Sequence, residues 1–281
     1  MAKRILPGRT VGNNKDMAET SKNGSAYELS GPDGAPVVAL IHGLGLNRHV
    51  WQWHEPALAS RYRVLNYDLY GHGESALPPT TPSLSIYAEQ LVDLLDLLSI
   101  ERCAIAGFSL GGMINRRFAI DYPERLQALA IFNSPHERSP AAQKLVEERA
   151  MHSDDGGPRA TLDATIERWF TPAYRNREVE IIRMISEWVL ANDHQAYAQA
   201  RWVLANGVIE LIRPDPAIDV PTLVMTAEND SGSTPAMAHA IAAEISDAET
   251  IIVPGLQHMG LVENPGSFSN PLLRFLDWAL V

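Results

Sequence analysis

One stretch, residues 103–114, constrains the fold of this chain more than any other. An apolar run there leads through Gly-Phe-Ser-Leu-Gly into a helix-forming segment. We expect a buried strand, a tight turn and a helix, with Ser109 at the apex in the positive-φ region that residues with a Cβ rarely adopt. Gly107 and Gly111 have no side chains, so the strand and the helix can pass close together beneath the turn. The hydroxyl of Ser109 would then lie clear of the backbone, near the positive end of the helix dipole. The alternative is an ordinary glycine-rich turn, and the motifs in the rest of the chain distinguish the two interpretations.

The remaining sequence alternates short apolar runs with helical patterns. Runs typical of buried strands lie at 25–29, 36–41, 62–68, 126–133, 221–226 and 249–253. Helical spacing appears at 51–60, 85–98, 110–121 and 267–279. This alternation predicts an α/β fold in which a mostly parallel central sheet is flanked by helices.

Strand signals vanish in the middle of the chain. Between 134 and 219 they are replaced by amphipathic helical segments at about 139–151, 160–170, 175–190 and 193–205. We therefore predict a core formed by residues 21–133 and 220–281 and a helical cap formed by residues 134–219. Residues 1–20 are polar and are expected to form a flexible tail, in which Met17 is an alternative start.

Composition excludes several classes of partner. The 281 residues carry a net charge of −11, which disfavours nucleic acid and anionic membrane surfaces because phosphate binding needs clustered Lys and Arg. No run approaches the roughly 18 apolar residues of a membrane span, and the N-terminal segment lacks the apolar core of a secretory signal. The one cysteine, Cys103, suits a reducing compartment. We expect a cytoplasmic protein of undefined oligomeric state.

A serine needs a positioned base, and that base needs an orienting acid, before it can act as a nucleophile. In a parallel sheet such partners lie where strands end. Asp230 follows the run 221–226 and His258 follows the run 249–253, in the order serine, acid, histidine. We predict that Ser109, Asp230 and His258 are catalytic, with Glu228 as the alternative acid.

An acyl-transfer site also needs donors for a developing oxyanion. We expect the backbone N–H of Leu110, the residue after the serine, and the backbone N–H of Leu44, in the loop after 36–41. His42 and His72 lack the spacing of metal ligands and are expected to support loops beside the site. We predict no metal and no cofactor.

Four separated segments resemble the α/β-hydrolase superfamily. They are His42-Gly43-Leu44-Gly45, residues 67–75, residues 107–112, and the loops of Asp230 and His258. Within the superfamily the chain looks most like the 3-oxoadipate enol-lactonases, through His49-Val50-Trp51, residues 109–113 and Tyr197. The resemblance implies an α/β-hydrolase fold and a cofactor-independent hydrolase.

The helical cap would select the substrate. Trp169, Trp188, Trp202 and Tyr197 are candidates to line an apolar pocket, although such stripes also form helix cores. Arg138 and Arg201 are candidates to bind a substrate carboxylate, with solvated surface arginines as the alternative.

We therefore expect a serine hydrolase acting on a small-molecule ester or lactone. One alternative keeps the same triad for carbon–carbon bond hydrolysis or cofactor-free haloperoxidase or perhydrolase chemistry. Another alternative is a non-catalytic ligand-binding protein with a hydrolase fold.

Overall fold

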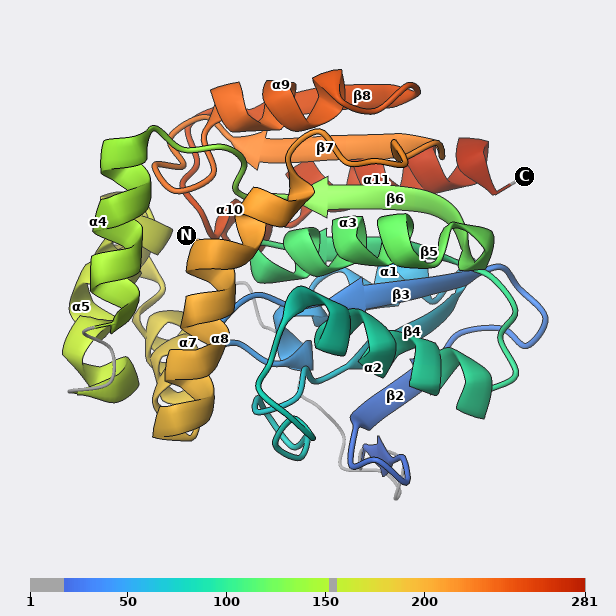
Figure 1. The fold of residues 1–281 in the computed structure, drawn as a ribbon, viewed down its shortest axis with the longest axis horizontal. Coiled ribbons are helices and arrows are strands. Elements are labelled where there is room, and N and C mark those ends of the chain that lie inside the picture. Colours follow the sequence, from blue (N-terminus) through green and yellow to red (C-terminus); the bar gives the residue numbers. More distant parts are fainter. Residues whose placement is uncertain (1–17, 152–155, 281) are drawn as a thin grey trace, which may run out of the picture.

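The computed structural model describes residues 18–151 and 156–280 (Figure 1). Met17 and most of the predicted tail lie outside the described residues. Within these ranges eight strands form one sheet in the order β1-β2-β4-β3-β5-β6-β7-β8. Their bounds are β1 (Glu19–Thr20), β2 (Ala26–Ser30), β3 (Val37–Ile41), β4 (Arg63–Tyr67), β5 (Cys103–Phe108), β6 (Leu126–Phe132), β7 (Thr222–Ala227) and β8 (Ala248–Val253). The pairs β1–β2 and β2–β4 are antiparallel, and every other pair is parallel. The predicted fold class is confirmed.

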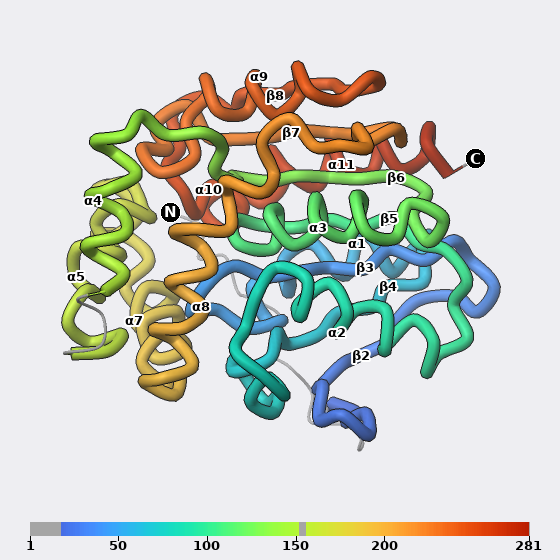
Figure 2. The backbone as a smooth tube through the Cα atoms, viewed as in Figure 1, coloured from blue at the N-terminus to red at the C-terminus, as the bar shows by residue number. Residues whose placement is uncertain are grey.

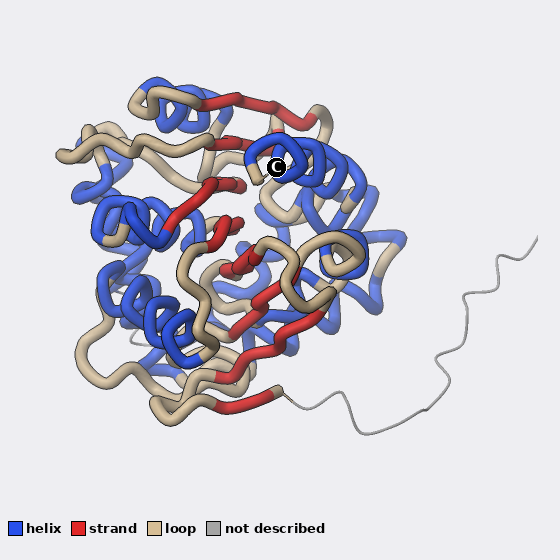
Figure 3. Tube along the Cα trace, turned by 90° about the vertical axis from the view of Figure 1, so that its right-hand side faces the viewer, coloured by secondary structure: helices blue, strands red, loops and turns tan. Residues whose placement is uncertain are grey.

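Helices cover both faces of the twisted sheet, as the view along the strands shows (Figure 3). One face packs against α1 (Glu55–Leu58) and α11 (Gly266–Ala279). The other packs against α2 (Leu84–Leu97), α3 (Leu110–Asp121) and α9 (Pro235–Ala243). Strands β5 and β7 are buried along their whole length because helices lie above and below them.

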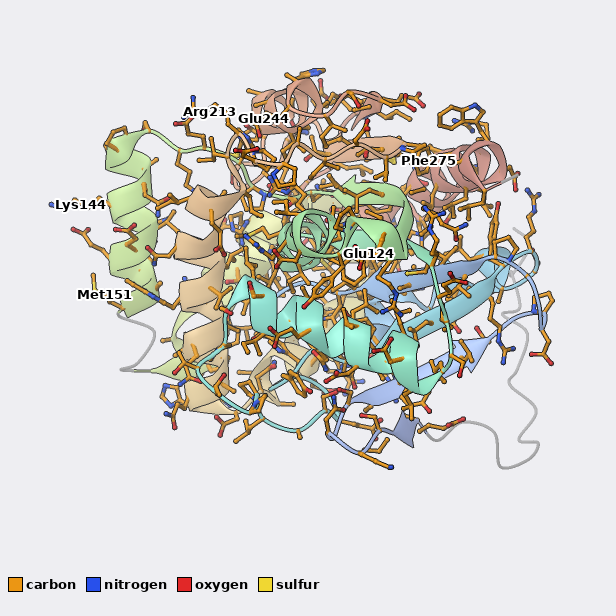
Figure 4. The ribbon with its side chains drawn as sticks, turned by 45° about the vertical axis from the view of Figure 1, so that its right-hand side comes forward. Glu124, Lys144, Met151, Arg213, Glu244 and Phe275 are labelled. Atoms are coloured by element: carbon orange, nitrogen blue, oxygen red, sulfur yellow. The ribbon has the colours of Figure 1, made fainter. Side chains whose placement is uncertain are left out.

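A helical insertion, defined here as residues 134–219, lies between β6 and β7 in the chain. It contains α4 (Pro140–Met151), α5 (Gly157–Trp169), α6 (Pro172–Arg177), α7 (Val179–Leu190), α8 (His194–Asn206) and the 3₁₀ turn η4 (Gly207–Leu211). These helices gather at the carboxyl ends of the parallel strands (Figures 1 and 2). On α4, Lys144 and Met151 point away from the rest of the molecule, so the outer side of this helix faces solvent (Figure 4).

The structure corrects four local expectations. Glu19 and Thr20, assigned to the flexible tail, pair with Tyr27 and Ala26 as the edge of the sheet. The segment 51–60 contains only the short α1, preceded by the 3₁₀ turn Arg48–Trp51. Helix α9 was not predicted. It begins where the Thr234 hydroxyl accepts from the N–H of Met237 at 3.3 Å, with a proline in its first turn.

The fourth correction concerns the expected helix at 175–190, which is two helices. Thr171 caps α6, accepting a hydrogen bond from the N–H of Tyr174 at 3.3 Å, and a proline follows at the first helical position. Glu178 then leaves the helical region, with φ −109° and ψ 51°. The chain can therefore change direction before α7 begins, although no glycine or proline between residues 173 and 190 marks the break in the sequence.

Candidate active site

Ser109 lies at a strained turn between β5 and α3. Its φ is 57° and its ψ is −111°, in the region that side chains with a Cβ rarely adopt. The turn is held because the Ser109 N–H donates to the carbonyl oxygen of Phe132 on β6, at 2.8 Å. A Cβ at Gly107 would overlap the carbonyl oxygen of Gly111, and a Cβ at Gly111 would overlap that of Ile41. The two glycines therefore allow the close passage of strand and helix that the sequence predicted.

Ser109, His258 and Asp230 form one continuous chain of hydrogen bonds. The Nε2 of His258 lies 3.2 Å from the Oγ of Ser109, and its Nδ1 lies 2.6 Å from the Oδ2 of Asp230. All three side chains are buried. They come from loops after β5, β7 and β8, whose parallel arrangement brings their carboxyl ends to the same edge of the sheet.

Asp230 is held as an ionised carboxylate. Its Oδ1 accepts from the N–H groups of Gly232 at 2.9 Å and Ser233 at 3.0 Å. Burial by itself raises the pKa of Asp230, but the charge of His258 and the hydrogen bonds from His258, Asn133 and Ser233 outweigh it, so the pKa lies below its ordinary value. An ionised Asp230 must accept the hydrogen bond, so the proton of neutral His258 lies on Nδ1 and Nε2 is free to accept from Ser109.

Glu228, the alternative acid, faces elsewhere. Its side chain is exposed, and its Oε2 accepts from the N–H of Gly255 at 2.8 Å. Glu228 therefore ties the ends of β7 and β8 together, while Asp230, two residues later, meets the histidine.

Asn133 supports the acid and was missed by the sequence reasoning. It follows β6 directly, has a φ of 47°, and its Nδ2 donates to the Oδ2 of Asp230 at 2.9 Å. The signal that could have found it is its position, since it ends a strand beside the strand that carries Asp230.

The loop after β3 runs alongside the serine. A Cβ at Gly43 would lie 3.2 Å from the Cβ of Ser109, so only a glycine backbone comes this close without displacing its neighbours. Leu44 follows in this loop, and Leu110 is the first residue of α3, where a backbone N–H has no acceptor within the helix. The oxyanion role of these two N–H groups stays a prediction.

His42 and His72 hold this region together, as the sequence predicted. The Nδ1 of His42 lies 2.8 Å from the carbonyl oxygen of Gly43, and its Nε2 accepts from the N–H of Leu69 at 3.0 Å. The two imidazole rings meet edge to face with centroids 5.3 Å apart. Burial lowers the pKa of His42 to about 4 and that of His72 to about 3, so both rings are neutral near pH 7.

Two of the predicted insertion residues lie next to this machinery. The ring of Trp169, at the end of α5, lies 6.1 Å from the ring of His258, and its carbonyl oxygen accepts from the N–H of Met259 at 2.8 Å. Tyr197 on α8 packs against Gly45, where an added Cβ would lie 2.9 Å from the tyrosine ring. Trp188 lies further out, with its ring 6.3 Å from that of His49.

Trp202 and Arg138 have other surroundings, and their roles in substrate binding stay predictions. Trp202 is 44% exposed and lines a surface groove with Leu84 and Ile209. Five residues along a helix turn the direction by about 140°, so Trp202 cannot share a face with Tyr197. The Nη1 of Arg138 donates to the carbonyl oxygen of Ala205 at 3.2 Å, which ties the start of α4 to the end of α8. Arg201 lies in a hollow beside α5, and its role in binding a substrate carboxylate stays a prediction.

Over residues 18–151 and 156–280, no cluster of three or more His, Cys, Asp or Glu side chains is arranged to hold a metal ion. Within the same ranges, none of the helices combines the length and the apolar character needed to cross a bilayer.

Comparison with known proteins gives a consistent result over most of the chain. A model of the alpha/beta hydrolase family matches residues 38–270. The chain is similar to 3-oxoadipate enol-lactonase 2 of Acinetobacter baylyi, with 27% identity over 87% of this chain and 90% of the relative. It is 30% identical to the putative carbamate hydrolase RutD of Klebsiella pneumoniae over 85% of this chain and 90% of that protein. The crystal structure of the enol-lactonase from Burkholderia xenovorans superimposes with a TM-score of 0.83 and 28% identity, covering 90% of this chain and 96% of that one.

Proposed function

The chain belongs to the alpha/beta hydrolase family, and we propose that it is a serine hydrolase that cleaves a small ester or lactone through an acyl-enzyme. The observation that carries the proposal is the hydrogen-bonded chain from Ser109 through His258 to Asp230. The relatives named as an enol-lactonase and a putative carbamate hydrolase support hydrolysis at an acyl carbon.

In the first half of the reaction Ser109 is the nucleophile. Its Oγ attacks the substrate carbonyl carbon while its proton passes to the Nε2 of His258, which the 3.2 Å separation allows. Asp230 stabilises the imidazolium that forms, because its carboxylate lies 2.6 Å from Nδ1. The imidazolium then protonates the leaving oxygen, and the acyl group stays on Ser109.

The developing negative charge on the carbonyl oxygen requires donors that are already in place. The backbone N–H groups of Leu44 and Leu110 are the proposed pair. His42 holds the peptide unit before Leu44 through its contact with the carbonyl oxygen of Gly43. The hydrogen bond from the Ser109 N–H to the carbonyl oxygen of Phe132 holds the turn before Leu110. Little reorganisation is then needed when the charge forms.

In the second half water takes the place of the alcohol. His258, neutral again, removes a proton from a water molecule that attacks the acyl-enzyme, and it returns the proton to Ser109 as the carboxylic acid leaves. A lactone would give a single hydroxy-acid product, which rearranges to a keto acid if the lactone is an enol ester. The insertion residues nearest the triad, Trp169 and Tyr197, are the proposed contacts for the rest of the substrate.

The test is a substrate panel run on the wild type and on Ser109→Ala. We expect the wild type to hydrolyse an activated aryl ester with a burst of the alcohol product, as acyl-enzyme accumulates. An enol-lactone and a ring-fission dienoate in the same panel separate C–O from carbon–carbon cleavage. Ser109→Ala should abolish turnover.

The matched control is Ser60→Ala, because Ser60 is exposed and its hydroxyl donates to the nearby carbonyl oxygen of Ala57 at 2.7 Å. It should retain wild-type turnover. Esterase activity that persists undiminished in Ser109→Ala would refute the nucleophile. A wild type that binds but never turns over any member of the panel would favour a ligand-binding protein.

A further inference from the structure

A hollow of about 360 Å³ lies on the helical insertion, apart from the triad itself. It is lined by Arg149, Thr161, Ala164, Thr165, Arg168 and Arg201. The residues come from α4, α5 and α8, and both α4 and α5 pack against α8 (Figure 1). Three guanidinium groups thus converge on one small concavity of a chain whose net charge is −11.

Two of these arginines pair with no carboxylate in the part of the chain that the structure describes. Within the described ranges the guanidinium of Arg168 makes no hydrogen bond or ion pair, and Arg201 donates from Nη1 to the neutral Oγ1 of Thr161 at 3.0 Å. Several arginines elsewhere pair with acids, as Arg61 does with Asp277 at 2.5 Å, whereas Arg116 and Arg138 donate to backbone carbonyl oxygens. Arg149 already has a partner of its own, so Arg168 and Arg201 are the guanidinium groups best placed to bind a ligand.

Arg168 lines the hollow and remains accessible to solvent, but its positive charge is disfavoured by its surroundings. Partial loss of water lowers the pKa of its guanidinium, and the positive charges of Arg201 and Arg149 lower it further, against the opposing effects of Asp230 and Tyr197. A bound anion would relieve this repulsion and replace the lost hydration. Guanidinium groups suit carboxylate and phosphate oxygens because they donate two parallel N–H bonds.

The hollow adjoins the loop that carries the acid. A Cβ at Gly232 would lie 2.7 Å from the Nη1 of Arg168, and the N–H of Gly232 donates to the Oδ1 of Asp230 at 2.9 Å. On α8, Arg201 follows one helical turn after Tyr197, which packs against Gly45 in the loop proposed to bind the oxyanion. Helix α5, through Arg168, and helix α8, through Arg201, therefore connect the hollow to the candidate active site.

We propose that this hollow is a binding site for a small anion with a carboxylate or phosphate group, held by Arg168 and Arg201. The anion is either a free ligand or the charged end of the substrate, and only the second case rests on the proposed function.

The first experiment measures binding directly, by titration calorimetry with succinate and with inorganic phosphate. It uses the Ser109→Ala protein, so that no turnover intervenes. We expect binding to at least one of these anions, weakened about tenfold or more by Arg168→Gln and by Arg201→Gln, because each removes charged hydrogen bonds. Arg183→Gln is the control, since Arg183 is exposed on α7 and pairs with Glu180 and Glu187. It should leave the affinity unchanged.

The second experiment identifies the source of the anion. It compares kcat/KM for two aryl esters that are matched except for a terminal carboxylate on the acyl chain. If the substrate supplies the anion, Arg168→Gln and Arg201→Gln should lower the ratio of charged over neutral ester about tenfold or more. If the ratio is unchanged while anion binding is weakened, the hollow is a site for a free anion.

Absence of succinate and phosphate binding at millimolar concentration, together with an unchanged ester ratio, overturns the proposal. So does binding that is equally strong in the Arg168→Gln, Arg201→Gln and Arg183→Gln proteins. Because calorimetry needs no catalysis, an inactive wild type would refute the proposed hydrolase without deciding the fate of this site.

Discussion

The Nδ1 of His42 lies 2.8 Å from the carbonyl oxygen of Gly43, in the same peptide unit that carries the N–H of Leu44. A trans peptide is planar, and its C=O and N–H point in opposite directions, so holding one fixes the other. The other ring nitrogen, Nε2, accepts from the N–H of Leu69 at 3.0 Å, so the imidazole is anchored at both ends. His42 is thus placed to orient one of the two proposed oxyanion donors without touching a substrate.

The first prediction is that His42→Phe lowers kcat with little change in KM. The ring keeps its approximate volume but loses both hydrogen bonds, so the Leu44 N–H is no longer held in the orientation proposed for binding the oxyanion. The decrease should not exceed the roughly 10²–10³-fold that loss of one donor causes.

Stopped-flow and steady-state kinetics with an aryl ester check this prediction, with the folded fraction measured by circular dichroism. His239→Gln, an exposed change on α9, is the control. A folded His42→Phe enzyme with wild-type kcat would show that the loop needs no such support.

The second prediction separates the two acids. Asp230→Asn should lower kcat about 10⁴-fold, because an amide at this position favours the wrong imidazole tautomer and cannot stabilise the imidazolium. Glu228→Gln should keep nearly full activity, since Glu228 is exposed and contacts the N–H of Gly255 instead.

Both variants are compared by kcat with one ester at pH 8. If Glu228→Gln had the lower kcat of the two variants, Glu228 and not Asp230 would be the acid.

The third prediction concerns the stability of the fold as pH falls. Burial lowers the pKa of His42 and His54 to about 4 and that of His72 to about 3, whereas a histidine in the unfolded chain titrates near 6.5. Below that value the unfolded state binds more protons than the folded state. The stabilising contribution is complete above about pH 6.5 and declines toward pH 4, by up to about 1.4 kcal/mol per pH unit for each histidine. Asp230, whose pKa is also lowered, adds a loss only at still lower pH.

Urea unfolding at pH 7.5, 6.0 and 5.0 measures this slope. His54→Gln should make it shallower, because the change removes one of the histidines whose pKa is lowered by burial. The amide of glutamine can replace the hydrogen bonds that His54 makes to Ser269 and Leu261, at 2.8 and 2.9 Å. An unfolding free energy that stays constant from pH 7.5 to 5.0 would contradict the prediction.

Much of the fold was predictable because the signals are local. The turn at Ser109 needs glycines at fixed distances on either side, and the buried strands need continuous apolar runs. The order of the acid and base loops followed from the rule that sites gather where parallel strands end. The break at Glu178 between α6 and α7 was not predicted, since no glycine or proline marks it in the sequence.

The sequence by itself determined the α/β architecture, the strained serine and the two loops in which an acid and a histidine follow their strands. Only the tertiary structure decided which side chains meet. Asp230 faces His258 while Glu228, two residues earlier, ties β7 to β8. Trp169 reaches the histidine while Trp202 faces solvent, and Arg168 and Arg201 share one hollow. The physical reason is that periodicity states which face of an element is apolar, whereas the partner of each side chain depends on how separate elements pack.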